Sequence, residues 1–317
     1  MPIEITVIIC TRNRASQLRQ VLQSAAEMTI PHGLDWEFIV IDNGSTDNTA
    51  EVVGSFADRL PIRCVREDTA GLSNARNRGV VEAKGNYICW TDDDVEIDNA
   101  WLSAYYASFL RHPDAAVFGG RVIPKMLPPT PAWFDDMKTI WPVSSLLAYR
   151  NLSEVEIPLS FASGNTPYGA NFAIRAKEQK SVLYDPDLGV SPNHKRVGEE
   201  TEVIYKIFKT GAKGWWVPES KVNHIIPQGR QTLRYVYDYF YLVGETFAFM
   251  RDRYYDDNHL IANRKPDLYD AGRGHLFMKL CWKLAQLPVK LLYKKSSFVR
   301  GLAQVGYLAG AYSYKSK

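Results

Sequence analysis

The chain has 317 residues, of which 46% are hydrophobic and 23% are charged. That is enough apolar material for one large folded domain with an appendage, and it excludes a mainly disordered chain. The net charge of +3 is unevenly distributed, because residues 271–317 contain nine Lys or Arg and no Asp or Glu, which leaves a net charge of about −6 on the first 270 residues. No recognition motif or basic aromatic platform accompanies this basic tail, which argues against nucleic-acid binding.

Neither export nor membrane insertion is predicted. The N-terminus runs directly into a strand-like segment, without the basic and apolar regions of a signal peptide. Lys279, Lys283 and Lys290 interrupt the most apolar segment, so that no stretch reaches the length of a spanning helix. The four cysteines show no C-x-x-C spacing. We therefore expect reduced thiols and a cytoplasmic protein.

Over the first 125 residues, short β-branched segments alternate with helix-length segments. They predict strands at 3–10, 36–42, 62–66, 87–91 and 116–124. Apolar strands separated by helices are typical of a Rossmann-like, mostly parallel sheet that helices cover on both faces. In such sheets ligands bind outside the carboxyl ends of the strands. The fold class expected is therefore α/β, with a site at that edge.

The rest of the chain is less regular. Residues 125–165 are rich in proline and predict an irregular insertion. Regular elements are predicted again at 168–175 (strand), 199–209 (helix), 215–217 and 221–226 (strands) and 232–251 (helix). We expect a catalytic domain at 1–251, divided into a nucleotide-binding half (1–125) and an acceptor-binding half (126–251), then a linker at 252–270 and a basic helical tail at 271–317.

Three consecutive carboxylates, Asp92, Asp93 and Asp94, follow the predicted strand at 87–91. Clustered carboxylates repel one another, and a divalent cation removes that cost. Mg²⁺ and Mn²⁺ prefer oxygen ligands and leave positions for the oxygens of a diphosphate. The alternative is a solvated acidic turn at the start of the next helix.

Other polar loops follow the neighbouring strands. Residues 42–47 combine turn and capping residues, and Gly71 precedes a helix that carries Arg76. A helix start together with a guanidinium suits a diphosphate. The alternative is an ordinary strand-to-helix connection.

Four motifs occur in order: T-R-N-R at 11–14, D-N-G-S-x-D at 42–47, G-L-S-x-A-R-N-x-G at 71–79 and D-x-D at 92–94. Together they resemble the nucleotide-binding half of family 2 glycosyltransferases, closely over residues 3–125 and more weakly to about residue 226. The resemblance implies the GT-A fold, with Asp94 and Asp92 as ligands of Mn²⁺ or Mg²⁺. It also implies nucleotide-binding roles for Thr11, Arg12, Arg14, Asp42, Asp68, Arg76, Asp92 and Asp93.

Later motifs extend the resemblance. Residues 198–202 are similar to the family's G-E-D-x-E motif, which implies that Glu200 is the catalytic base, although Glu replaces the usual Asp. The alternative is that these acids complement the dipole of a first helical turn. His224 stands where some members supply a metal ligand, or it is structural. Candidate acceptor contacts are Asn171, Glu199 and Trp215, with core packing as the alternative for Asn171.

A Q-x-x-R-Y sequence at 231–235 is similar to the Q-x-x-R-W motif of processive synthases. Tyr replaces Trp, and the same spacing suits an exposed first helical turn. We therefore expect a single, non-processive transfer.

The tail predicts an amphipathic helix over 276–293. Its leucines, at 276, 280, 284, 287 and 291, fall on one face, with lysines on an adjacent arc. Such a helix binds an anionic membrane surface, or it docks on the catalytic domain with its lysines in water. Both interpretations remain open at this point.

The function expected is an inverting, metal-dependent hexosyltransferase that moves sugar from a nucleotide diphosphate, UDP-sugar first, to a hydroxyl of a glycan or lipid-linked glycan in polysaccharide biosynthesis. It would act in the cytoplasm or peripherally on the cytoplasmic membrane face. The alternative is a nucleotide-binding scaffold or partner subunit without appreciable turnover. A nicotinamide-dependent dehydrogenase is excluded, because residues 10–14 lack the glycines of its phosphate-binding turn.

Overall fold

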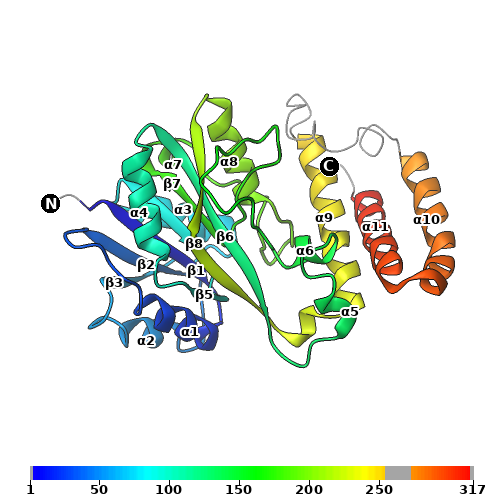
Figure 1. Ribbon diagram of the computed structural model, residues 1–317, viewed down its shortest axis with the longest axis horizontal. Coiled ribbons are helices and arrows are strands. Elements are labelled where there is room, and N and C mark those ends of the chain that lie inside the picture. The colour runs from blue at the N-terminus through cyan, green and yellow to red at the C-terminus, as the bar shows by residue number, and fades with distance from the viewer. Residues whose placement is uncertain (1–2, 254–272, 315–317) are drawn as a thin grey trace. The chain divides into compact units, whose positions relative to one another are not determined.

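The computed structural model describes residues 3–253 and 273–314. Its sheet has eight strands in the order β3-β2-β1-β4-β7-β6-β8-β5 (Figure 1). The pairs β1–β2, β2–β3 and β1–β4 are parallel, whereas β7 runs antiparallel to β4 and β6, and β5 antiparallel to β8. The strands are β1 (Ile5–Thr11), β2 (Trp36–Asp42), β3 (Ile62–Arg66), β4 (Tyr87–Thr91), β5 (Val95–Ile97), β6 (Ala115–Met126), β7 (Asn171–Arg175) and β8 (Lys213–Ile226).

The predicted strands at 36–42, 62–66 and 87–91 agree with β2, β3 and β4 residue for residue. The strands predicted at 215–217 and 221–226 form one strand, β8. Pro218 does not interrupt it, because the φ of proline is compatible with extended backbone and only one ladder donor is lost. The short strand β5 was not predicted.

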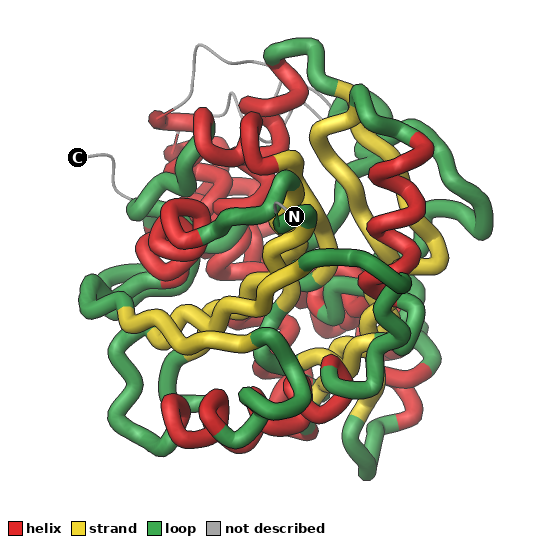
Figure 2. Tube along the Cα trace, turned by 90° about the vertical axis from the view of Figure 1, so that its left-hand side faces the viewer, coloured by secondary structure: helices red, strands yellow, loops and turns green. Residues whose placement is uncertain are grey.

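Helices cover both faces of the sheet. Phe172 and Asn171 are neighbours on β7, so their side chains point to opposite faces. Phe172 packs in a buried cluster that includes Val80 of α3 and Val203 of α8, whereas Asn171 bonds to α4. Figure 2 shows the strands side by side, with helices beside them. The helices are α1 (Ala15–Ala25), α2 (Thr49–Gly54), α3 (Leu72–Glu82), α4 (Trp101–Arg111), α5 (Ala132–Asp135), α6 (Val143–Leu146), α7 (Ala176–Ser181), α8 (Glu199–Lys209), α9 (Leu233–Arg253), α10 (Arg273–Tyr293) and α11 (Lys295–Ser313), with a 3-10 turn at Gln228–Arg230.

The chain divides into two compact units. The first comprises Met1–Ile123, Arg150–His194 and Glu199–Ile225, and the second Pro124–Tyr149, Lys195–Gly198 and Ile226–Lys317. β7 and nearly all of β8 therefore belong to the same unit as β1–β4, although the predicted boundary at residue 125 placed them in the other half. Residues 252 and 253 of the predicted linker complete α9, and its remainder lies outside the described residues.

In the second unit, α11 packs closely on α9 and α10 packs on α11. Glycine permits the close approach: a Cβ at Gly244 of α9 would collide with the Tyr307 carbonyl, and one at Gly310 of α11 with the Tyr241 carbonyl. Val236 and Phe240 of α9 share a core with Val299 and with residues 134–147 of the predicted 125–165 insertion. Among the described residues, no helix is both long and apolar enough to cross a membrane.

Candidate active site

The carboxyl ends of the parallel strands bring the polar loops together, as predicted. Thr11 is in register with Asp42, and Asp42 is in register with Arg66. The Asn43 amide then ties the second loop to the third, donating to the carbonyls of Glu67 at 3.1 Å and Thr69 at 2.8 Å. Sequentially distant loops therefore form one continuous edge.

Asp42 is the buried carboxylate of this edge. It is 5% exposed, accepts a hydrogen bond from the Ser45 N–H at 2.8 Å, and has the Arg66 guanidinium 3.5 Å away. Asp68 is exposed and pairs with the same arginine at 2.7 Å. Arg12 is exposed as well. Of the residues expected to contact the nucleotide, Asp42 is thus a buried carboxylate, whereas Arg12 and Asp68 are exposed charged side chains.

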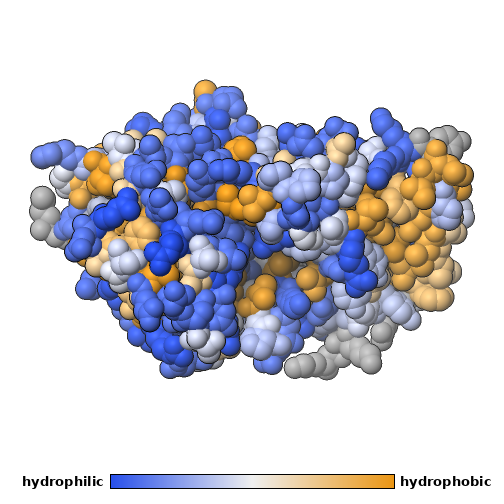
Figure 3. All heavy atoms as spheres, turned by 90° about the horizontal axis from the view of Figure 1, so that it is seen from below, coloured by the Kyte–Doolittle hydropathy of each residue, from blue (hydrophilic) through white to orange (hydrophobic). Residues whose placement is uncertain are grey.

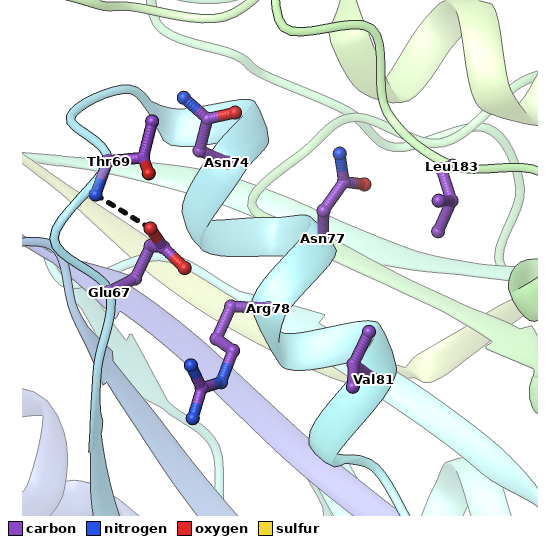
Figure 4. Close-up of a pocket in the computed structure, with 7 residues that line it drawn as sticks. All are labelled: Glu67, Thr69, Asn74, Asn77, Arg78, Val81 and Leu183. Atoms are coloured by element: carbon purple, nitrogen blue, oxygen red, sulfur yellow. Dashed lines mark hydrogen bonds between the residues drawn. The ribbon is translucent and has the colours of Figure 1, made fainter.

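A pocket of about 280 Å³ lies along α3, beside these loops (Figure 4). Its polar side chains are already engaged within the protein: Asn77 bonds to the backbone of Tyr184, and Arg78 pairs with Glu82. None of the predicted site residues lines it. We therefore assign the chemistry to the carboxylate edge and not to this pocket. The lining residues are Glu67, Thr69, Asn74, Asn77, Arg78, Val81 and Leu183.

Two members of the acidic triplet, Asp93 and Asp94, are buried and are held by the first loop. Asp93 is 5% exposed and accepts hydrogen bonds from the Thr11 hydroxyl at 2.7 Å and from Arg14 at 2.6 Å. Arg14 also reaches Asp94 at 3.0 Å. Burial raises the pKa of Asp93 to about 6, and the pKa of Asp92 is also raised, mainly by burial. The solvated acidic turn considered above does not describe Asp93 and Asp94, whereas the Asp92 side chain is 38% exposed.

The pairing of β5 with β8 brings His224 to this triplet. His224 is in register with Val95, and the next residue donates its N–H to the Asp94 carbonyl at 2.8 Å. The His224 Nε2 consequently lies 3.6 Å from an Asp94 carboxylate oxygen, and the imidazole is 7% exposed. β5 was not predicted, so the route by which His224 reaches Asp94 was not visible in the sequence, and only the family resemblance had indicated His224 as a metal ligand.

The donor set fits a divalent cation that also takes ligands from a diphosphate. Within the described residues, no group of three His, Cys, Asp or Glu is arranged to hold a metal by itself. Mg²⁺ and Mn²⁺ sites with substrate phosphates need only one or two protein ligands, and Asp94 with His224 offers two. A cation here would also lower the raised pKa of Asp92 and Asp93, since it favours their charged forms.

Arg76 lies among the carboxylates on the other side of Asp92. It is 4% exposed, with its guanidinium 3.7 Å from Asp92 and 3.4 Å from Glu199. Aromatic rings surround it: its guanidinium carbon lies 5.4–5.9 Å from the ring centroids of Tyr184, Phe172 and Trp90. Because these rings come from two strands and a loop that are far apart in the sequence, no local sequence pattern could reveal the cage.

Glu199 and Glu200 begin α8 beside this arginine. Glu199 is 5% exposed, and burial together with the neighbouring Glu200 raises its pKa above the usual carboxyl range. Glu200 is partly exposed. A Cβ built on Gly169 would lie 3.3 Å from the Glu200 carboxyl carbon and 3.4 Å from Arg76. Gly169 therefore leaves the space in which these side chains meet, a role that the sequence analysis missed.

Asp92 connects the two halves of the site. Its carboxylate interacts electrostatically with Arg76, Asp94, His224 and Glu200. Asp94 and Glu200 therefore belong to the same site.

The predicted diphosphate site at the start of α3 needs correction. The Gly71 N–H donates to the Asn43 side chain at 2.8 Å, and the Leu72 N–H donates to the Val190 carbonyl at 2.9 Å. The Ser73 hydroxyl bonds to the Leu188 carbonyl at 2.7 Å. The segment around 188–190 thus occupies the helix start, and Arg76 faces the carboxylates instead of this end.

The prediction that Asn171 contacts the acceptor substrate is wrong. It is fully buried, its side-chain oxygen accepts hydrogen bonds from the Trp101 indole at 2.8 Å and the Tyr105 hydroxyl at 2.7 Å, and its nitrogen donates to the carbonyls of Arg121 and Ser220. Its hydrogen-bonding capacity is therefore used in the core, where it joins α4 to the sheet.

Trp215 is also remote from the site. It stacks on His112 with 3.9 Å between ring centroids. It lies nine residues before His224 on β8, roughly 30 Å along an extended strand. Its position is therefore explained by packing at the other end of the sheet.

Gln231 of the weak Q-x-x-R match is structural too. It is 2% exposed and donates to the carbonyls of Leu127 at 2.8 Å and Ile226 at 3.0 Å. Arg234 is exposed and pairs with Asp238. Both contacts are those expected of the start of α9.

Relatives of known sequence match part of the chain. A segment of 104 residues is 32% identical to the cholesterol galactosyltransferase of Borreliella burgdorferi. It covers 32% of this chain and 28% of that protein. The chain thus matches about a quarter of that relative's length.

Solved structures match nearly the whole chain. A mannosyltransferase from Pyrobaculum calidifontis in complex with GDP-Man and Mn²⁺ superposes with a TM-score of 0.67 at 17% identity, over 98% of this chain and 86% of that one. TarS of S. aureus in complex with UDP-GlcNAc superposes with a TM-score of 0.55 at 14% identity, over 98% and 91%. These likenesses establish the GT-A-like fold. Residues 6–164 match the profile of Glycosyl transferase family 2, and the chain belongs to that family.

Proposed function

We propose that the protein transfers a sugar from a nucleotide diphosphate to an acceptor hydroxyl, with inversion at the anomeric carbon and with Mn²⁺ or Mg²⁺ as cofactor. The observation that carries this proposal is the gathering of the Asp94–His224 pair and Glu200 around Asp92. A cation-binding pair and a partly exposed carboxylate in one site are what leaving-group stabilisation and deprotonation of an acceptor require.

The donor side is assigned to the loops after β1, β2, β3 and β4. Asp42, Thr11, Arg12 and Asp68 would contact the nucleoside, and Arg14, which is about one-third exposed, would move between the acidic triplet and the donor phosphates. UDP-sugar is the first choice of donor, supported by the UDP-GlcNAc complex of TarS, although the mannosyltransferase complex holds GDP-Man. When bound, the metal would offset the charge that develops on the leaving diphosphate.

Glu200 is proposed as the general base. Glu199 is buried against Arg76, whereas Glu200 is partly exposed at the same edge, so only Glu200 is accessible to an acceptor. Its carboxylate would take the hydroxyl proton as the acceptor oxygen attacks the anomeric carbon. Arg76 and Gly169 would position it, one by charge and the other by leaving space.

The acceptor is proposed to be a glycan or lipid-linked glycan in polysaccharide biosynthesis at the cytoplasmic membrane face. A relative named for galactosyl transfer to cholesterol supports a lipid acceptor within the family. All four cysteines are free thiols, which supports a reducing compartment.

Nucleotide release from a panel of nucleotide sugars, measured with Mn²⁺ and with EDTA, tests the proposal. We expect turnover that EDTA abolishes, that D94A loses together with the Mn²⁺-dependent thermal shift, and that E200Q reduces by about 10²- to 10⁴-fold with donor affinity retained. E154Q is the matched control, because Glu154 is an exposed carboxylate in an ordinary ion pair with Arg121. Donor binding by the wild type without turnover on any acceptor would instead show a nucleotide-binding scaffold and refute the proposal.

A further inference from the structure

Helix α10 is apolar on two faces. One face packs on α11: Leu276 is 3% exposed, and the Leu287 side chain lies 3.0 Å from where a Cβ on Gly301 of α11 would stand. The sequence placed these leucines on an apolar stripe that could face either a membrane surface or the catalytic domain. In the structure, packing within the second unit uses them instead.

The opposite face is exposed, and we call it the outer face. Figure 3 shows hydrophobic side chains gathered at the right of that view, where α10 lies. At about 100° per residue, its members cover roughly half of the helix circumference. Single exposed apolar side chains are ordinary, whereas a contiguous group marks an interaction site. The outer face consists of Phe277, Met278, Trp282, Leu284, Val289, Leu291 and Leu292, which are 46–86% exposed among the described residues.

Positive charge lies near this face. Lys283 and Lys290 are partly buried on the side of the helix toward α11, where Lys290 lies against Gly301, and Lys294, Lys295 and Arg300 are exposed just beyond the end of the outer face. No Asp or Glu occurs anywhere in residues 271–317. A second copy of the chain docking here would bring two basic surfaces together, whereas an anionic surface would be attracted.

We propose that the outer face of α10 docks in the plane of an anionic lipid bilayer. Because the other face of the helix is packed on α11, only the outer face is available to lipid, so α10 lies along the surface with its length of about 30 Å parallel to it. Trp282 suits the bilayer interface, since its ring is apolar and its N–H is polar. The attraction of Lys and Arg to anionic headgroups falls with added salt.

Vesicle flotation of the full chain tests this docking without donor, acceptor or metal, so that its outcome is independent of the proposed reaction. We expect the wild type to float with vesicles of phosphatidylcholine and phosphatidylglycerol at 3:1, and to float at least several-fold less with phosphatidylcholine alone or in 0.5 M NaCl. The double variant W282S/L292S should lower the bound fraction on anionic vesicles about tenfold, whereas W282F should retain it.

The matched control is V81S/L110S, which removes two apolar side chains of similar exposure, 72% and 64%, from α3 and α4. It should float like the wild type. M278S/L291S is a second outer-face variant, in case the first fails to fold by circular dichroism. Wild type that stays with the unbound fraction, or folded outer-face variants that float unchanged, would overturn the proposal. A dimer that W282S/L292S dissociates, with no vesicle binding, would assign the face to a second copy instead.

Discussion

The buried guanidinium of Arg76 offers the sharpest test of how the site is held. At 3.4 Å from Glu199 and 3.7 Å from Asp92, each attraction amounts to about 4–5 kcal/mol at an effective dielectric constant of ~20. Removing one partner of a buried pair typically costs ~3–5 kcal/mol, because the other charge stays buried without compensation. R76M keeps the bulk inside the aromatic cage and removes only the charge and its hydrogen-bonding group. We expect it to lose unfolding free energy at pH 8, with about 3–5 kcal/mol as the upper limit.

The loss should depend on pH in a definite direction. Without Arg76, the pKa values of Glu199 and Asp92 rise further above their unfolded values, by one unit for each ~1.4 kcal/mol of lost attraction. At a pH where both acids are neutral in the wild type as well, the missing cation costs little. As pH rises through their wild-type pKa values, the wild type forms the two charged pairs while the acids of the variant stay neutral, so the cost grows. Urea unfolding of R76M should therefore show a smaller deficit at pH 5.5 than at pH 8.

The same shift should appear in catalysis. The acid limb of the pH profile of kcat/KM should move upward by at least about one unit in R76M, and R76K should restore part of the difference because it restores the charge. R234M is the matched control, since Arg234 pairs with Asp238 at an exposed position and should change neither property. Equal deficits at both pH values, together with an unmoved acid limb, would refute the role assigned to Arg76.

Three further predictions follow from single contacts. G169A places a methyl group against Glu200 and Arg76 and should lower kcat by about 10- to 100-fold, with the unfolding midpoint nearly unchanged. The control is G229A, whose added methyl group meets nothing within 4 Å and which should match the wild type. N171L leaves the Trp101 and Tyr105 donors buried without their hydrogen-bond acceptor and should lower the unfolding free energy, measured in urea, by about 3 kcal/mol or more. A raised KM for the acceptor substrate at unchanged stability would contradict this. The Asp93 pKa of about 6 lies above its unfolded value, so ionisation of Asp93 destabilises the metal-free protein. The contribution of Asp93 to the unfolding free energy should therefore fall by roughly 2–3 kcal/mol as pH rises from 4 to 7.5. Added Mn²⁺ should reverse the fall, D93N should lack it, and urea titrations with and without metal would expose a failure of either expectation.

Local sequence patterns were sufficient to place the elements that neighbouring residues delimit. The strands β2, β3 and β4 could be placed from their apolar runs because each is bounded by turn residues. Parallel strands share one carboxyl edge, so the polar loops after them had to meet, and Thr11, Asp42 and the acidic triplet could be placed together before any coordinates.

Tertiary structure decided which polar groups face the site and which serve the core. A polar residue has the same sequence signature whether its partners are a substrate or its own protein, so Asn171 and the start of α3 could not be distinguished from binding groups until their hydrogen bonds were known. The leucines of α10 posed the same question, because a 3.6-residue period describes a helix packed on protein as well as one facing lipid.

The sequence by itself determined the α/β architecture, the edge at which ligands bind and the carboxylates that line it, since these follow from hydrophobic periodicity and strand direction. Only the tertiary structure brought His224 to Asp94 through β5, enclosed Arg76 in rings from two strands and a loop, and left the outer face of α10 exposed. The reason is physical: each of these arrangements joins side chains far apart along the chain, and their energies depend on distances that exist only once the chain has packed.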